Sequence, residues 1–335
     1  MITRRKERLD RGIKVRTEGL YAVSSRWEIT YLMVPRLALI LGLLILPLIV
    51  PGMYWQKVIC ATAVSALLAI AFDFLANYVG LVCLGGAFFT GVGGYMAGIL
   101  NFYFGLSPAL AIPIATLGGA LICTLLLCPA LPLRGVYFAI ITFMYPLFMP
   151  KILTALNIWG GTEGLSGLAT FPNVWVELYL SLGILLIVLF GFRRLVNEDY
   201  GLVLRGIKDN DQGVKASGIN VTLCKVQALF LASLVGCFCG AFLSHVYGWC
   251  GLSLFALDFS ILPIAAAVMG GMGTLVGPLL GALILAPLSE VLRAFGTLRI
   301  TFYCVVLLSF IIFKPEGLMN YFQRKYHQFE HWIEV

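Results

Sequence analysis

The chain alternates long apolar runs with short polar connections. Most runs are about 20 residues long, which is the length that an α-helix needs to cross a bilayer, and they lack the period-2 alternation of membrane β-strands. We therefore predict an all-α, polytopic membrane helix bundle with about 8–10 transmembrane helices. The last part is open to two interpretations, because residues around Gly270–Gly277 form either two full spans or a broken pair. Ten spans can be drawn, at 34–54, 58–79, 81–100, 108–132, 135–155, 174–192, 225–247, 259–273, 276–294 and 297–313.

Basic residues are distributed unevenly between the two ends of these spans. Nine of them come at or before the start of the first span, from Arg4 to Arg36, and nineteen of the 23 lysines and arginines fall on that same side when the spans are followed in order. Cytoplasmic segments carry such an excess, so we expect both termini in the cytoplasm. The predicted organisation is a basic N-terminal segment at 1–33, a transmembrane domain at 34–313 and a cytoplasmic tail at 314–335.

One polar island interrupts the apolar pattern, between Arg193 and Lys225. It holds six of the lysines and arginines and also Glu198, Asp199, Asp209 and Asp211. A segment this rich in charge faces water, and packing within the bilayer does not require it. We expect the island, a cytoplasmic loop at 193–225, to be the place where a soluble partner acts on the membrane helices.

Composition agrees with a membrane location. The chain is 60% hydrophobic and 12% charged, with a mean hydropathy of +0.96, which is too apolar for a soluble globule. The net charge of +7 is explained by the topology of the spans and by contact with membrane lipid. We expect no nucleic-acid partner.

Glycines and a few polar residues inside the spans are candidates for a transport path. Gly94 and Gly98, and Gly236 and Gly240, have the spacing that places two small residues on one helix face. This favours close helix packing, although a glycine-lined path or a helix break would use the same residues. Asp73, with Asn77 four residues later, either makes a structural pair or lines the path.

The sequence lacks the usual signatures of catalysis. It has no G-x-x-x-x-G-K-[ST] motif for nucleotide phosphates and no H-E-x-x-H metal motif, and no nucleophile with a matched base stands out within the spans. We expect a chain that is not an enzyme and that binds neither cofactor nor metal, so that any ATP is hydrolysed by partner subunits.

Several stretches together resemble the second type of membrane permease subunit of branched-chain (hydrophobic) amino-acid ABC importers. They cover most of the chain between residues 72 and 319 and are specific only in combination. The island differs from the usual pattern in having Gly213-Val214 instead of two alanines, and Cys83 and Trp159 also differ. The stretches are GLVCLGGAFFTGVGGY (80–95), RGVYFAIIT (134–142), WGGTEGL (159–165), NDQGVKASGI (210–219), GGMGTLVGPLLGA (270–282) and PEGL (315–318).

The resemblance implies a role for each part of the chain. A short helix at Asp211–Gly218 would seat in an ATPase subunit, with Asn210 or Asp209 as its N-cap and Gly218 with Asn220 at its end. The residues expected to couple to the ATPase are Asn210, Asp211, Gly213, Val214, Ala216, Gly218 and Ile219. Those expected along the translocation path are Asp73, Asn77, Gly85, Gly91, Tyr95, Tyr137, Thr142, Gly270 and Gly271.

The same resemblance implies the partners and the location. They are a homologous permease subunit forming a heterodimer, two ABC ATPase subunits and an extracytoplasmic substrate-binding protein, in a bacterial or archaeal inner membrane. The solute would be a branched-chain or hydrophobic amino acid, and urea, amides and aromatic acids are alternatives. A stand-alone, ion-coupled transporter or channel remains the alternative function, although the scarcity of intramembrane carboxylates and histidines counts against it.

Overall fold

The computed structural model describes residues 39–45, 47–48, 52–133 and 135–292, together with 305, 308–309, 312 and 317–319. The predictions for the basic N-terminal segment, for Arg134 and for nearly all of the C-terminal tail lie outside these residues, as do most of spans 34–54 and 297–313. Two units are distinguished, Met1–Leu46 and Pro47–Val335. In the first, the described residues 39–45 are helical, and everything below concerns the second.

The second unit is a helix bundle, as predicted. Six helical segments in the described part of the chain are long and apolar enough to cross a membrane, and α12 is a shorter apolar helix. The helices, in order, are α3 (Met53–Asp73), η1 (Phe74–Val79), α4 (Gly86–Phe104), α5 (Pro108–Leu127), η2 (Cys128–Ala130), α6 (Val136–Leu156), α7 (Val174–Asn197), α8 (Asp199–Asp209), α9 (Asp211–Ala216), α10 (Val221–Tyr247), η3 (Leu252–Phe255), α11 (Asp258–Gly270) and α12 (Val276–Val291). The strands are β1 (Leu165–Ser166) and β2 (Trp249–Cys250), which pair antiparallel.

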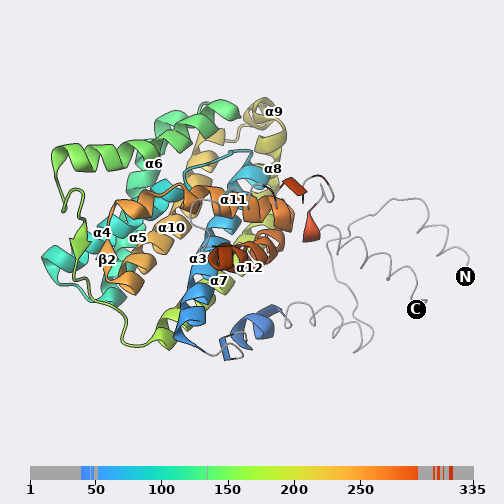
Figure 1. The fold of residues 1–335 in the computed structure, drawn as a ribbon. Helices are drawn as coiled ribbons and strands as arrows, with labels where there is room; N and C mark the ends of the chain where they lie inside the picture. The colour runs from blue at the N-terminus through green and yellow to red at the C-terminus, as the bar shows by residue number, and fades with distance from the viewer. Residues whose placement is uncertain are drawn as a thin grey trace, which may run out of the picture. The chain divides into compact units, whose positions relative to one another are not determined.

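The helix α10 forms the centre of the bundle and packs on α3, α4 and α5 (Figure 1). Glycine makes the α4–α10 contact possible, since a Cβ atom on Gly240 would overlap the carbonyl oxygen of Thr90 and one on Gly236 would press on Phe89. Small residues let apolar helices approach closely where no hydrophobic force distinguishes a neighbouring helix from lipid. The prediction of close packing at Gly236 and Gly240 is confirmed.

One ion pair and one backbone contact fix the end of the bundle opposite the island. Lys57 at the start of α3 pairs with Glu177 at the start of α7 at 2.6 Å, and its ammonium donates to the carbonyl of Val246 at the end of α10 at 3.5 Å. Thus α3 and α7 run parallel and α10 runs against them. The predicted order of spans, with three spans between α3 and α7 and none between α7 and α10, requires this arrangement.

The glycine-rich segment near residue 270 breaks the last apolar pattern. The helices α11 and α12 have 13 and 16 residues and are separated by Gly271–Leu275. With η3, α11 belongs to a helical segment of 19 residues, Leu252–Gly270, that is long enough to cross a bilayer, whereas α12 is shorter than the roughly 20 residues needed. The two helices pack closely, because a Cβ atom on Gly270 would overlap the carbonyl of Gly277. The structure thus contains a helix break near Gly270–Gly277, at Gly271–Leu275.

Candidate functional site

The polar island is mostly helical, whereas the sequence predicted a helix only at Asp211–Gly218 within it. The helix α7 continues beyond the predicted span end at 192 to Asn197, and α8 follows after a single residue, Glu198. The pattern of buried and exposed side chains explains why α8 forms a helix on the surface. Leu204 and Ile207 on one face are buried, while Lys208 and Asp209 are exposed. This is an amphipathic surface helix. Figure 1 shows α8 and α9 together beyond the end of the bundle where α7 ends and α10 begins.

The short helix α9 starts at the predicted residue, Asp211, and ends close to the predicted end. Asn210 is its N-cap, and the side-chain oxygen accepts from the backbone N–H of Gln212 at 3.0 Å and of Gly213 at 3.2 Å. The helix ends at Ala216, two residues before the predicted end, and Gly218 follows with φ +85°, a left-handed conformation that glycine adopts without strain. Asn220 does not end α9 but caps α10, accepting from the N–H of Leu223 at 3.1 Å.

The helix α9 lies on the surface but is attached to α10 by an ion pair. None of its residues is buried, and the apolar Ile219 just after it is 37% exposed. The first residue, Asp211, pairs with Lys225 of α10 at 2.8 Å, and both side chains are almost covered, at 13% and 10% exposure. A displacement of α9 therefore acts directly on the central helix. In the sequence, Lys225 is only the residue that follows the island motif, and spacing does not identify its partner.

A second attachment joins α8 to the start of α10. The hydroxyl of Tyr200 donates to the carbonyl of Cys224 at 3.2 Å. Burial raises the pKa of this hydroxyl to about 12, so it remains a donor throughout the physiological range. Together with the Asp211–Lys225 pair, this contact makes the island one connected unit on the end of α10.

The residues predicted along the translocation path lie in two places, along α4 and at the break between α11 and α12, with Tyr137 apart from both. Gly85, Gly91, Tyr95 and Thr142 lie along α4 and its neighbours. The hydroxyl of Thr142 accepts from the N–H of Leu84 at 3.0 Å, and the ring of Tyr95 lies 5.8 Å from that of Phe255. The hydroxyl of Tyr95 is buried and has no hydrogen-bond partner among the described residues.

The second group comprises Asp73, Asn77, Gly270 and Gly271, at the break between α11 and α12. The amide of Asn77 donates to the carboxylate of Asp73 at 2.7 Å, as their spacing predicted, and Asp73 is fully buried. Tyr137 is the exception, since it lies on the surface of α6 with 72% exposure. Within one subunit Tyr137 borders no interior space.

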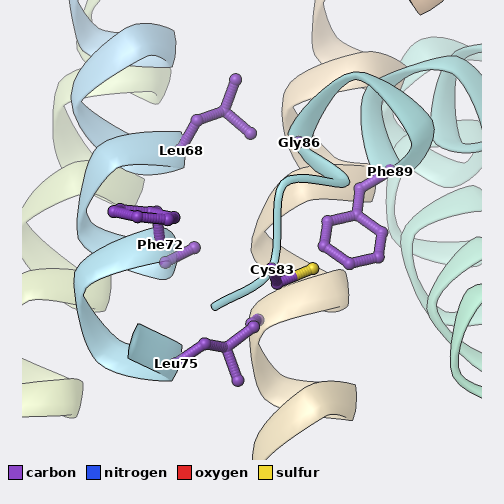
Figure 2. Close-up of a pocket in the computed structure, with 8 residues that line it drawn as sticks. Leu68, Phe72, Leu75, Cys83, Gly86 and Phe89 are labelled. Carbon is purple, nitrogen blue, oxygen red and sulfur yellow. The ribbon is translucent and has the colours of Figure 1, made fainter. Parts of the chain in front are cut away.

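A small apolar cavity lies beside the first group (Figure 2). Leu68, Phe72 and Leu75 line it from α3 and η1, and Cys83, Gly86 and Phe89 line it from the segment that opens α4. Its volume of about 20 Å³ is enough for about one water molecule. The helices must therefore separate here before a solute could pass between α3 and α4.

The comparisons with known proteins agree with the motifs. The high-affinity branched-chain amino acid permease proteins LivM of Salmonella typhimurium and Escherichia coli are each 26% identical over 290 residues, covering 77% of this chain and 68% of theirs. A probable LivM of Methanocaldococcus jannaschii is 26% identical over 265 residues, covering 70% and 76%. No solved structure matches.

These relatives and the six apolar helices indicate a multi-pass protein of a bacterial or archaeal inner membrane. The family described as "Branched-chain amino acid transport system / permease component" matches residues 55–313, which is most of the chain. The protein thus belongs to the family of permease components of branched-chain amino acid transport systems.

Proposed function

We propose that this permease subunit works in an ATP-driven importer and that α9, with the residues around it, is the helix on which a separate ATPase subunit seats. The observation that carries the proposal is that Asp211–Ala216 has no buried residue and yet is held to the central helix by a nearly covered ion pair. An exposed helix offers a surface to a soluble subunit, and the ion pair passes its displacement to α10. The coupling residues are those from Asn210 to Ile219.

The proposed assembly contains a homologous permease subunit, two ATPase subunits and an extracytoplasmic substrate-binding protein. ATP is bound and hydrolysed on the ATPase subunits, and this chain binds no cofactor. Both of its termini lie in the cytoplasm. These proposals are supported by the description of the family as one component of a transport system and by the excess of basic residues on one side of the spans.

The proposed solute is a branched-chain or other hydrophobic amino acid, as in the names of the relatives. The buried hydroxyl of Tyr95, which no described residue satisfies, supports a path along α4, because a passing solute could accept or donate a hydrogen bond there. Tyr137 fits a path only where two permease subunits meet, since it is exposed on α6. Urea, amides and aromatic acids are the alternative solutes, to be separated by a ligand screen on the cognate binding protein.

The test is co-purification followed by reconstitution. Tagged full-length chain is expected to retain the ATPase subunit encoded next to it, and Ile219→Asp is expected to abolish this, because a carboxylate then lies in the proposed contact. Arg194→Asp is the matched control, a charge change at an exposed position of the same island but outside α9. The proposal fails if Ile219→Asp and Arg194→Asp retain equal amounts of ATPase.

Reconstitution separates this function from the alternative of a stand-alone transporter. Uptake into liposomes should need all subunits and ATP. Uptake by this chain alone that an ionophore abolishes and ATP does not restore would establish the ion-coupled alternative.

A further inference from the structure

The break between α11 and α12 is held in a strained conformation by residues outside it. Three of its five residues have positive φ angles, Gly271 at 107°, Gly273 at 83° and Leu275 at 57°. A non-glycine residue in this region is sterically unfavourable and persists where surrounding contacts impose it. The side chain of Leu275 is 2% exposed, so burial is one such contact, and α3 supplies the others.

Asp73 and Tyr78 fasten the break to the end of α3. The carboxylate of Asp73 accepts from the N–H of Gly273 at 2.7 Å and from the N–H of Leu275 at 3.2 Å. The hydroxyl of Tyr78 donates to the carbonyl of Gly273 at 2.7 Å. The carboxylate of Asp73 thus satisfies two backbone donors of the break just before α12, which begins at Val276. Within the first turn of α12, the N–H of Gly277 donates to the hydroxyl of Thr274 at 2.9 Å.

The short helix η1, which follows α3, also contacts the α8 helix of the island. The ammonium of Lys208 donates to the carbonyl of Asn77 at 2.9 Å, and the guanidinium of Arg205 lies 5.4 Å from the centre of the Tyr78 ring. Gly80 lets the α8 backbone approach, because a Cβ atom there would lie 3.2 Å from the Cα atom of Lys208. Thus α8 and the break, about 65 residues apart in sequence, contact one six-residue segment.

That segment, η1, is a π-helix from Phe74 to Val79. A π-helix is rare and short and is frequently found at functional sites, and its hydrogen bonds span one residue more than those of an α-helix. A change between the two hydrogen-bonding patterns rotates the residues that follow. Transmission through η1 requires that both patterns be accessible and that contacts on its two sides bias them.

We propose that η1 transmits displacement of the α8 helix to the break between α11 and α12, with Asp73 and Tyr78 as positioning residues. The proposal deepens the proposed function and rests on it, because an ATPase subunit on the island would supply the displacement. It extends the effect of the island beyond α10. The break then changes shape together with the island, although no residue of α8 belongs to it.

The first test measures the linkage in the full chain without nucleotide. Hydrogen exchange of residues 270–278 is compared for the wild type, Asp73→Asn, Tyr78→Phe and Lys208→Met. Exchange is expected to rise about tenfold or more in Asp73→Asn, which loses bonds to a buried carboxylate, and about two- to fivefold in Lys208→Met, which loses one exposed contact. Tyr78→Phe should fall between them, since it loses one buried neutral hydrogen bond and keeps the ring.

The matched control is Thr62→Val, a buried residue of the same helix whose hydroxyl donates within α3, to the carbonyl of Val58 at 2.8 Å, and to no other described residue. It should leave exchange at 270–278 unchanged. Acceleration in Asp73→Asn alone would mean a local cap with no connection to α8 and would overturn the proposal. Unchanged exchange in Tyr78→Phe and Lys208→Met overturns it too, and these two mild variants decide the matter if Asp73→Asn does not fold.

The second test uses the complete complex trapped with ATP and vanadate. Trapping is expected to change exchange at 270–278 by about fivefold or more in the wild type, and this difference should be lost in Tyr78→Phe and Lys208→Met while Thr62→Val keeps it. A trapped wild-type complex with an unaltered break refutes the transmission even though the ATPase subunit is bound. Failure of the ATPase subunit to bind refutes the proposed function instead, and the measurement on the full chain then still decides the linkage.

Discussion

Two ion pairs in the polar island have the same length but very different exposure, and this difference makes a quantitative prediction. Lys225 and Asp211 are 2.8 Å apart with side chains 10% and 13% exposed. Arg194 and Glu198 are also 2.8 Å apart, but 84% and 60% exposed. We predict that Lys225→Met loosens α9 strongly and that Arg194→Met has little effect on it.

The expected magnitudes follow from the two environments. A hydrogen bond to a charged group contributes about 1.5–3 kcal/mol when its loss leaves a poorly hydrated partner. Asp211 keeps other interactions after Lys225 is replaced, so we take about 2 kcal/mol, which corresponds to about a 30-fold change in an equilibrium. An exposed i, i+4 pair contributes about 0.3–0.5 kcal/mol, or about a twofold change.

The assay is hydrogen exchange of residues 209–220 in the full-length chain. Exchange there should accelerate about 30-fold in Lys225→Met and at most about twofold in Arg194→Met. Adding Asp211→Asn to Lys225→Met removes the carboxylate charge that has lost its lysine, so the double variant should be less perturbed than the sum of the two single variants.

Equal effects of Lys225→Met and Arg194→Met would refute the reasoning, because burial would then not determine the strength of these pairs. Additive effects of Asp211→Asn and Lys225→Met would show that the two side chains do not interact in solution. Either result would also remove the mechanical argument for α9 as the link to α10.

Three further predictions concern the bundle and the island. Gly240→Ala should lower the free energy of unfolding by about 1–3 kcal/mol or more, because its methyl group would overlap the carbonyl of Thr90. Gly183→Ala, where no heavy atom lies within 4 Å, should be neutral or stabilising by up to about 1 kcal/mol, and equal melting temperatures of the two variants would contradict the packing argument. Asn210→Ala should destabilise α9 by about 1 kcal/mol, seen as faster exchange of Gln212 and Gly213, and unchanged exchange would show that the cap is not needed. Burial raises the pKa of Tyr200 to about 12, so the contribution of its hydroxyl to stability is complete below about pH 10 and is lost as the pH rises toward 12. Thermal unfolding measured against pH should show this alkaline loss in the wild type and not in Tyr200→Phe. Identical alkaline profiles of the two proteins would contradict the prediction.

The sequence predicted the helices of the bundle well, with most span boundaries within a few residues. The match at 108–132, found as Pro108–Ala130, and at 135–155, found as Val136–Leu156, is representative. Length and hydropathy suffice for this, because a helix that crosses lipid must satisfy its backbone internally over about 20 residues. The cap at Asn210 was also predictable, since it depends only on residues two and three positions further along.

Contacts across the chain could not be predicted in the same way. Asp73 was expected to pair with Asn77 or to line a path, and the sequence contained no sign that its carboxylate would hold backbone groups 200 residues away. The helix α8 was missed because its mixture of charged and apolar residues was interpreted as a polar connection. The apolar face of α8 is recognisable as a packing surface only in the tertiary structure, where η1 lies against it.

The sequence by itself determined that the chain is a membrane helix bundle with one polar island and a glycine-rich interruption near residue 270. Only the tertiary structure decided which helices are central. The spans Val136–Leu156 and Val221–Tyr247 are both strongly apolar, yet 28% of the first and 72% of the second are buried within the chain. The physical reason is that lipid is as apolar as a neighbouring helix, so hydropathy marks what crosses the membrane but does not distinguish the side chains that face lipid from those that face protein.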